Sequence, residues 1–119
     1  MASKKKILIV DDEPDMVAGL QAFLEDNGYE TCSAFNGKEG IEVLKKEKPD
    51  LVTLDLMMPN DTGTRFYRNM TKNKEFKDVP VIIISGLPGR HLAASHPFAV
   101  FEKPIDRDKL LATIKQAIG

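Results

Sequence analysis

The sequence contains a single cysteine, Cys32, and no long hydrophobic run. One thiol cannot form an internal disulfide, and no partner cysteine is present for a zinc cluster, so we interpret Cys32 as a strand residue in a reducing compartment. The apolar run at residues 7–10 is too short for a signal peptide or a transmembrane helix. These absences predict a soluble, cytoplasmic protein.

An excess of charge of either sign is also missing. The chain has 17 basic and 18 acidic residues, whereas nucleic-acid-binding domains use a surplus of positive charge to neutralise phosphates. The one basic run, at residues 4–6, is interpreted as the solvated start of a strand, because three charges outside an amphipathic helix bind phosphate or membrane weakly. We therefore expect neither nucleic acid nor a membrane as a partner of this domain.

Several enzyme signatures are absent as well. There is no G-x-x-x-x-G-K-[ST] loop, and the glycine pairs at residues 37–40 and 86–89 match no dinucleotide fingerprint, so both are interpreted as turns. No Ser-His-Asp or Cys-His set is visible. The two histidines, His91 and His96, lie in a segment broken by prolines and are interpreted as loop residues, not metal ligands.

Short, nearly continuous apolar runs alternate with helical spacing of apolar residues. Continuous runs are typical of strands that are covered on both faces, as in a parallel sheet between two layers of helices. Strands are predicted at residues 7–10, 29–34, 51–54, 81–84 and 98–101, and helices at residues 15–27, 38–47, 62–72 and after Asp106. This alternation over 119 residues predicts one domain with an open, doubly wound α/β fold.

Three residues predict where helices begin or end. Gly28 stands where a glycine would end the first helix, and Asn36 and Asp106 can cap the second and the last helix. Pro88, Gly89 and Pro97 confine any helix between the fourth and fifth strands to residues 90–95, which is less than two turns. That helix is expected to be short or missing.

Polar residues follow the apolar runs in a pattern that predicts a site. Asp11 and Asp12 follow the first run, Asp55 the third and Ser85 the fourth, and Lys103 comes just after the last. In an open α/β sheet, ligands bind beyond the carboxyl ends of the strands. Carboxylates, a hydroxyl and an ammonium at one edge suit a phosphoryl group and Mg²⁺, which prefers oxygen ligands.

Four separated segments carry a resemblance to a known family. LIVDDEP at residues 8–14, DLVTLDLMMPNDTG at 50–63, VIIISG at 81–86 and VFEKP at 100–104 resemble the signatures of response-regulator receiver domains of two-component signalling. The resemblance covers nearly the whole chain. It implies a five-stranded parallel sheet in the flavodoxin-like order 2-1-3-4-5. It also implies a phosphoryl group received from a sensor histidine kinase or a phosphotransfer protein, and an unidentified protein target downstream.

The resemblance assigns roles in phosphoryl transfer. Asp55 is the expected phosphoacceptor, Asp12 a direct Mg²⁺ ligand, Asp11 a ligand acting largely through water, and the carbonyl of Met57 a further ligand. The chemistry requires such a set on independent grounds. A carboxylate and an anionic phosphoryl donor repel each other, so the site needs a divalent ion and a fixed ammonium.

Further residues match the family pattern for binding and switching. Lys103 is expected to neutralise a phosphoryl oxygen and Ser85 to hydrogen-bond another, and the Lys103–Pro104 peptide is often cis in relatives. Phe101 matches the aromatic residue that swings inward when the hydroxyl residue moves toward the phosphoryl group. Gly63 matches the glycine that ends the loop after Asp55.

Two apolar residues predict a long-lived phosphorylated state. Met57 and Leu87 stand at positions that flank the path of attacking water in relatives, and neither side chain can orient water. Met57 also argues against a haloacid-dehalogenase-type phosphatase, which would have a second aspartate there. Binding of partners without phosphorylation is an alternative that the complete acidic set disfavours. The domain could act alone or belong to a longer regulator or hybrid kinase.

Overall fold

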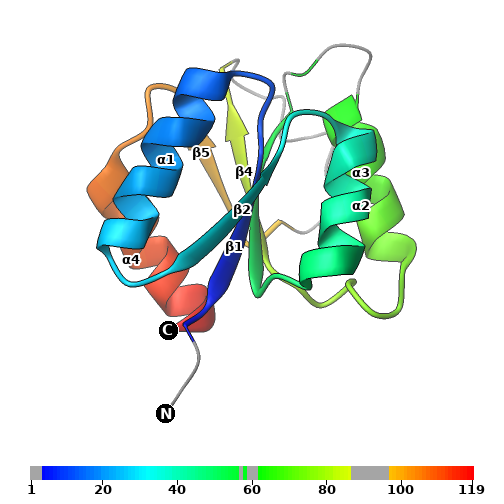
Figure 1. The fold of residues 1–119 in the computed structure, drawn as a ribbon. Helices are drawn as coiled ribbons and strands as arrows, with labels where there is room; N and C mark the ends of the chain where they lie inside the picture. The colour runs from blue at the N-terminus through cyan, green and yellow to red at the C-terminus, as the bar shows by residue number, and fades with distance from the viewer. Residues whose placement is uncertain (1–3, 57, 59–61, 87–96) are drawn as a thin grey trace.

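The computed structural model describes residues 4–56, 58, 62–86 and 97–119, and at Thr62 and Ser85 the backbone alone. Strands and helices alternate along these residues (Figure 1). In chain order they are β1 (Lys6–Val10), α1 (Pro14–Asp26), β2 (Glu30–Ala34), α2 (Gly37–Glu47), β3 (Leu51–Asp55), α3 (Thr62–Lys72), β4 (Val81–Ser85), β5 (Ala99–Glu102) and α4 (Arg107–Ile118).

The strands form one parallel sheet in the order β2-β1-β3-β4-β5. Helices α1 and α4 cover one face of the sheet, and α2 and α3 cover the other (Figure 1). This confirms the predicted doubly wound fold and its strand order. The short or missing helix expected between the last two strands falls on residues 87–96, which lie outside the described part of the chain.

The two faces of the sheet explain why the apolar runs are continuous. In β1, Ile7 and Ile9 pack under α1 and α4, while Leu8 and Val10 pack under α2 and α3. Successive side chains of a strand point to opposite faces, so a strand buried on both faces needs apolar residues at every position. Each face therefore has its own hydrophobic core, and the sheet holds the two cores together.

The predicted helix ends are confirmed with small shifts. The Asn36 side chain accepts the backbone N–H of Glu39 at 2.8 Å, and the Asp106 side chain accepts that of Lys109 at 3.1 Å. Gly28 has a φ of 93°, a conformation that suits glycine at the end of a helix. The first helix begins one residue earlier than predicted because proline fits the first helical position, where its missing N–H is not needed.

The last strand starts later than its apolar pattern predicts. Phe98 is 47% exposed and lies just before β5, although its backbone N–H still donates to the carbonyl of Val81 at 2.8 Å. An aromatic residue raises the strand propensity of a segment whether or not the sheet covers its side chain. The prediction of residues 98–101 was therefore wrong by one residue at each end, since β5 is Ala99–Glu102.

We predict that Thr53→Val stabilises the protein by about 1 kcal/mol, measured by urea unfolding. Thr53 is 1% exposed between Ile9 and Ile82, and its Oγ1 makes no hydrogen bond with any described residue. Replacing the hydroxyl by a methyl group removes a buried polar atom without changing the shape. The matched control is Val52→Thr, at a neighbouring position that is 0% exposed, and it should destabilise by a similar amount. Equal effects of the two substitutions would contradict the explanation.

Candidate functional site

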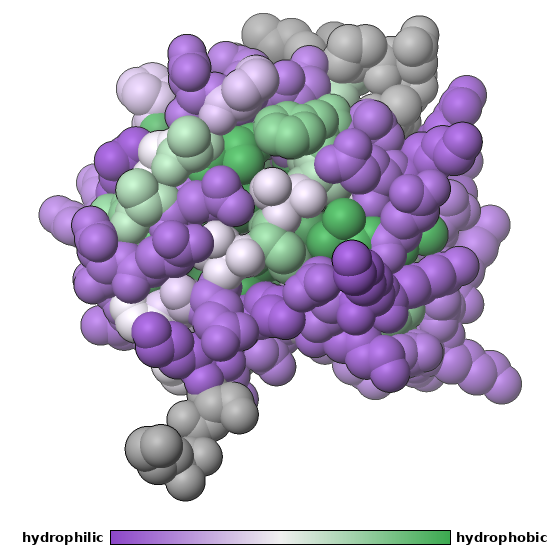
Figure 2. Space-filling model, in the orientation of Figure 1, coloured by the Kyte–Doolittle hydropathy of each residue, from purple (hydrophilic) through white to green (hydrophobic). Residues whose placement is uncertain are grey.

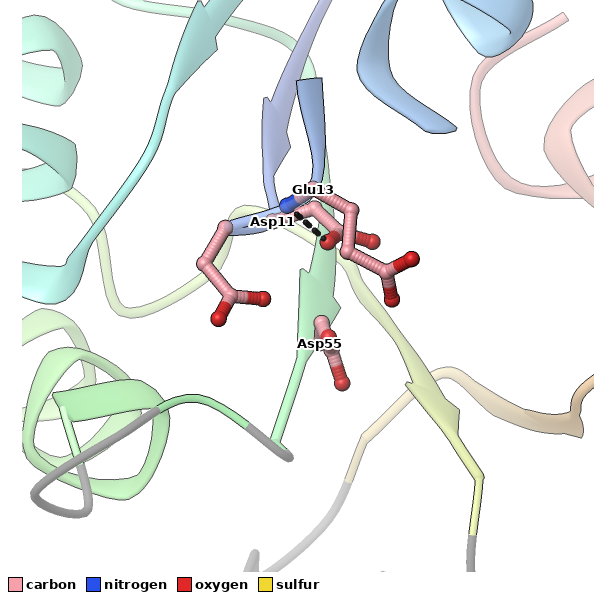
Figure 3. A group of neighbouring side chains, drawn as sticks. Asp11, Glu13 and Asp55 are labelled. Carbon is pink, nitrogen blue, oxygen red and sulfur yellow. Dashed lines mark hydrogen bonds between the residues drawn. The ribbon is translucent and has the colours of Figure 1, made fainter. Parts of the chain in front are cut away.

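Strand register places two acidic residues side by side at the carboxyl edge of the sheet. Val10 of β1 pairs with Leu54 of β3, so Asp11 and Asp55, the residues that follow, emerge next to each other. Each has only 2% of its surface exposed. Figure 3 shows both side chains at this edge, with Glu13 close by on the segment that leads into α1. The structure therefore brings together Asp11 and Asp55, as the strand pattern of the sequence predicts.

Four carboxylates converge at this edge. Asp11, Asp12, Glu13 and Asp55 each offer an oxygen, and these oxygens lie within 4.8 Å of one another. Oxygen ligands that come from different segments and are partly open to solvent suit Mg²⁺, because that ion keeps several waters in its octahedron. The donor set therefore fits the ion that the sequence predicts. The sequence pattern assigned no role to Glu13, although it is the third acid of LIVDDEP.

Among the described residues, one ammonium faces this acidic group. Lys103 Nζ donates to Asp55 Oδ2 at 3.3 Å and to Glu13 Oε1 at 3.2 Å, and it lies 3.8 Å from Asp11 Oδ2. Burial lowers the pKa of Lys103, but the charges of Asp55 and Asp11 outweigh this effect and raise it above the ordinary value. Lys103 is therefore a fixed positive charge. A single cation cannot balance this many carboxylates, so the edge retains a negative charge that a divalent ion would neutralise.

Comparison with known proteins identifies the family. The family model for the response regulator receiver domain matches residues 7–115. The chain belongs to this family. It is 35% identical to protein PilH of Pseudomonas aeruginosa over 121 residues, which covers 96% of this chain and 98% of PilH. It is 32% identical to protein Rrf1 of Nitratidesulfovibrio vulgaris over 114 residues, which covers 96% of this chain and 83% of Rrf1.

A solved structure shares the fold. The crystal structure of a CheY-like response regulator receiver domain protein from Methanospirillum hungatei JF-1 superposes with a TM-score of 0.83 at 28% identity, covering 96% of this chain and 93% of that one. The protein is therefore a phosphorylation-dependent receiver domain, a signalling phosphoacceptor. Among the described helices of this receiver domain, none is both long enough and apolar enough to cross a bilayer.

Burial dominates the electrostatics of Asp11 in the receiver site. The pKa of its carboxyl is raised to about 6, mainly by removal from water, and the neighbouring charge of Asp55 acts in the same direction. The backbone N–H of Glu13, which donates to Asp11 Oδ1 at 2.9 Å, and the charge of Lys103 act in the opposite direction. Ionisation of Asp11 therefore lowers the free energy of unfolding, and a bound cation would offset this loss.

The remaining predicted residues lie around this centre or outside the described part of the chain. Ser85 ends β4, where its backbone pairs with Glu102, but its side chain lies outside the described part. Met57 and Leu87 lie outside it too. Phe101 of β5 is half-buried against the core that includes Ile84 and Leu110. The Lys103–Pro104 peptide is cis, as the resemblance implied.

Gly63 couples helix α3 to the site. A Cβ atom at this position would lie 2.6 Å from the carbonyl oxygen of Asp55 and 3.0 Å from Cα of Leu56. Both are backbone atoms at the end of β3, so no side chain can be accommodated without moving the strand or the helix. The glycine therefore allows α3 to start directly against the strand that carries Asp55.

We predict that Asp11→Asn stabilises the metal-free protein by up to about 3 kcal/mol at about pH 7.5. Folding raises the pKa of Asp11 from 3.8 to about 6, so ionisation opposes folding. This opposition is absent below about pH 4, grows as the pH rises, and is complete above about pH 6. The stabilisation by asparagine should therefore disappear at about pH 4.

Urea unfolding with a chelator at both pH values measures this difference. Asp12→Asn, in the same acidic group but less buried, is the control and should change stability less. If Asp11→Asn raises the free energy of unfolding equally at the two pH values, burial of the charged carboxylate is not the cause.

Proposed function

We propose that Asp55 is the residue of this receiver domain that accepts the phosphoryl group. The observation that supports this proposal is the contact of the Asp55 carboxylate with Lys103 at 3.3 Å, at the edge where the acidic group gathers. An ammonium at this distance can neutralise a phosphoryl oxygen as charge develops on it. Asp11 and Glu13 lie near the same ammonium, but neither is at the end of the central strand β3.

We assign the Mg²⁺ ligands to Asp11, Asp12, Asp55 and the carbonyl of Met57. When bound, Mg²⁺ offsets the repulsion between the attacking carboxylate and the phosphoryl oxygens. Asp12 is the more open of the adjacent aspartates and acts as a direct ligand. Asp11 is buried, and one of its oxygens already accepts the N–H of Glu13, so it acts largely through water.

The proposed transfer needs the groups at this edge, Mg²⁺ and a phosphohistidine donor. A carboxylate oxygen of Asp55 forms a bond to phosphorus while the bond between phosphorus and the donor imidazole nitrogen breaks. The imidazole leaves with the bonding electrons and takes up a proton, and Asp55 becomes an acyl phosphate. Lys103 and the hydroxyl of Ser85 hold the phosphoryl oxygens. The donor is a sensor histidine kinase or a phosphotransfer protein, and an unidentified protein target reads the product.

We expect acetyl phosphate and Mg²⁺ to add one phosphoryl group to the protein, and Asp55→Asn to abolish the addition because asparagine has no carboxylate to attack phosphorus. Intact-protein mass spectrometry measures the outcome. Asp78→Asn removes an exposed carboxylate away from the acidic group and serves as the matched control, which should be labelled like the parent. Labelling of Asp55→Asn to the same extent as the parent would refute the assignment.

The lifetime of the label tests a second part of the proposal. Met57 and Leu87 are apolar and cannot orient a water molecule for attack on the acyl phosphate, so we propose that autodephosphorylation is slow. The same mass measurement, repeated after acetyl phosphate is removed, gives the rate of loss. A half-life of seconds would show that water reaches the phosphoryl group without help from these side chains.

We propose that Phe101 reports the switch to the phosphorylated state. Moving a two-state equilibrium from 1:99 to 99:1 takes about 5.5 kcal/mol. Charge-assisted hydrogen bonds contribute about 1.5 to 3 kcal/mol each, so bonds from Ser85 and Lys103, together with the metal, can supply this difference. Phe101 is half-buried on β5, two residues before Lys103, and so has space to change its exposure.

We expect the Phe101 side chain to change rotamer and become less exposed when beryllofluoride and Mg²⁺ mimic the phosphoryl group. Crystal structures with and without the mimic, or the NMR signal of a fluorinated phenylalanine at this position, measure the change. Phe23, half-buried on α1, is the internal control and should keep its environment. If Phe101 keeps the same rotamer in both states, it is a static core residue and does not report the switch.

A further inference from the structure

A groove runs along the seam between helices α2 and α3, on the face of the sheet opposite α1 and α4. Two open cavities of ≈ 380 Å³ and ≈ 200 Å³ lie in this seam, and both are lined by Ile41 of α2 and Asn69 of α3. Because they share these residues, the cavities form one continuous groove. Each helix has 11 residues, so the groove is about 16 Å long, enough for two to three turns of a helix.

The floor of this groove is apolar. Ile41 of α2 is partly exposed there, and Leu44, Phe66 and Met70 lie buried beneath the surface, each 1% exposed. Gly40 allows the two helices to meet beneath the floor, because a Cβ atom there would lie 2.8 Å from the ring of Phe66. Figure 2 shows hydrophobic atoms between hydrophilic side chains on the side of the molecule where α2 and α3 lie. The groove therefore offers apolar contact within a polar surround.

The sides of the groove are mainly basic. Lys38 and Lys45 of α2 and Arg65 of α3 line it, and all three are exposed. Within the described part of the chain, none of them forms an ion pair. Helix α3 contains no acidic residue, and Glu42 is the one acid that lines the larger cavity. Unpaired cations around an apolar floor favour a ligand that is apolar in the middle and acidic at its edges.

We propose that this groove binds an acidic amphipathic helix of a partner protein, with an apolar side chain on the partly exposed Ile41 and carboxylates against Lys38 and Arg65. Helix-in-groove recognition uses apolar anchors at i, i+3, i+4 and i+7 of the bound helix. Helix α1 of a second copy is acidic but cannot be the ligand, because Val17, Leu20 and Leu24 are buried against its own sheet. Since α1 is the one described helix with an excess of acidic residues, we assign the ligand to a different protein.

Two synthetic helical peptides of about 15 residues test the charge preference. Both carry leucines at the spacing of the anchors, one with glutamates and the other with lysines at the flanking positions. Backbone amide NMR of the intact, unphosphorylated protein follows both titrations. We expect the acidic peptide to shift the amides of α2 and α3 and to bind about tenfold more tightly than the basic peptide.

The double variant Lys38→Glu/Arg65→Glu should reverse this preference. Both positions lie in the first turn of their helices, where an acidic residue interacts favourably with the helix dipole, so the variant is expected to fold. Lys109→Glu/Lys115→Glu makes the same charge change at exposed positions of α4 and should leave the preference unchanged. Labelling by acetyl phosphate should be unaffected in both variants, which separates this proposal from the assignment of Asp55.

Three results would overturn the proposal. One is equal affinity of the acidic and basic peptides, which would leave only nonspecific apolar contact. Another is a set of shifted amides confined to α1 and α4, which would place the binding surface on the other face of the sheet. The third is the absence of shifts at about millimolar peptide.

Discussion

The attraction of Lys103 to two buried carboxylates stabilises the acidic edge of the sheet, where we propose the phosphoryl site. Asp11 and Asp55 lie on neighbouring strands with only 2% of their surface exposed, and the ammonium is within 3.8 Å of both. Their mutual repulsion in a poorly solvated position would destabilise the fold without a cation nearby. Lys103 supplies one positive charge, and the acidic group still lacks another. This remaining negative charge is what the proposed divalent ion would neutralise.

The location of this site could be predicted from the sequence because parallel strands end at the same edge. Each strand is a short apolar run, and the polar residue after each run must emerge beside its neighbours. Asp11, Asp55, Ser85 and Lys103 could be named on that basis, and the family resemblance added their roles. Gly63 could be named too, although only the structure gives the reason, which is the carbonyl of Asp55 directly beneath it.

Other features depend on packing that the sequence pattern does not contain. Glu13 contacts Lys103 across 90 positions of the chain, and this contact arises from the turn in which Asp11 accepts the N–H of Glu13. The α2–α3 groove depends on how closely two helices approach, which Gly40 controls through its contact with Phe66. The strand propensity of Phe98 suggested a strand that starts at this residue, but β5 starts at Ala99 and the sheet leaves the Phe98 side chain exposed.

Two helices on opposite faces of the sheet carry charges of opposite sign. Helix α1 carries Asp15, Glu25 and Asp26 with no basic residue, while α3, on the opposite face, carries Arg65, Arg68 and Lys72 with no acidic one. The protein is nearly neutral, with a net charge of −1, yet these two helices carry charge of opposite sign on opposite faces of the sheet. Fields are screened beyond about 8 Å at physiological salt. The contrast between α1 and α3 therefore acts only at the last step of an encounter, when one of the two helices comes close to a charged surface.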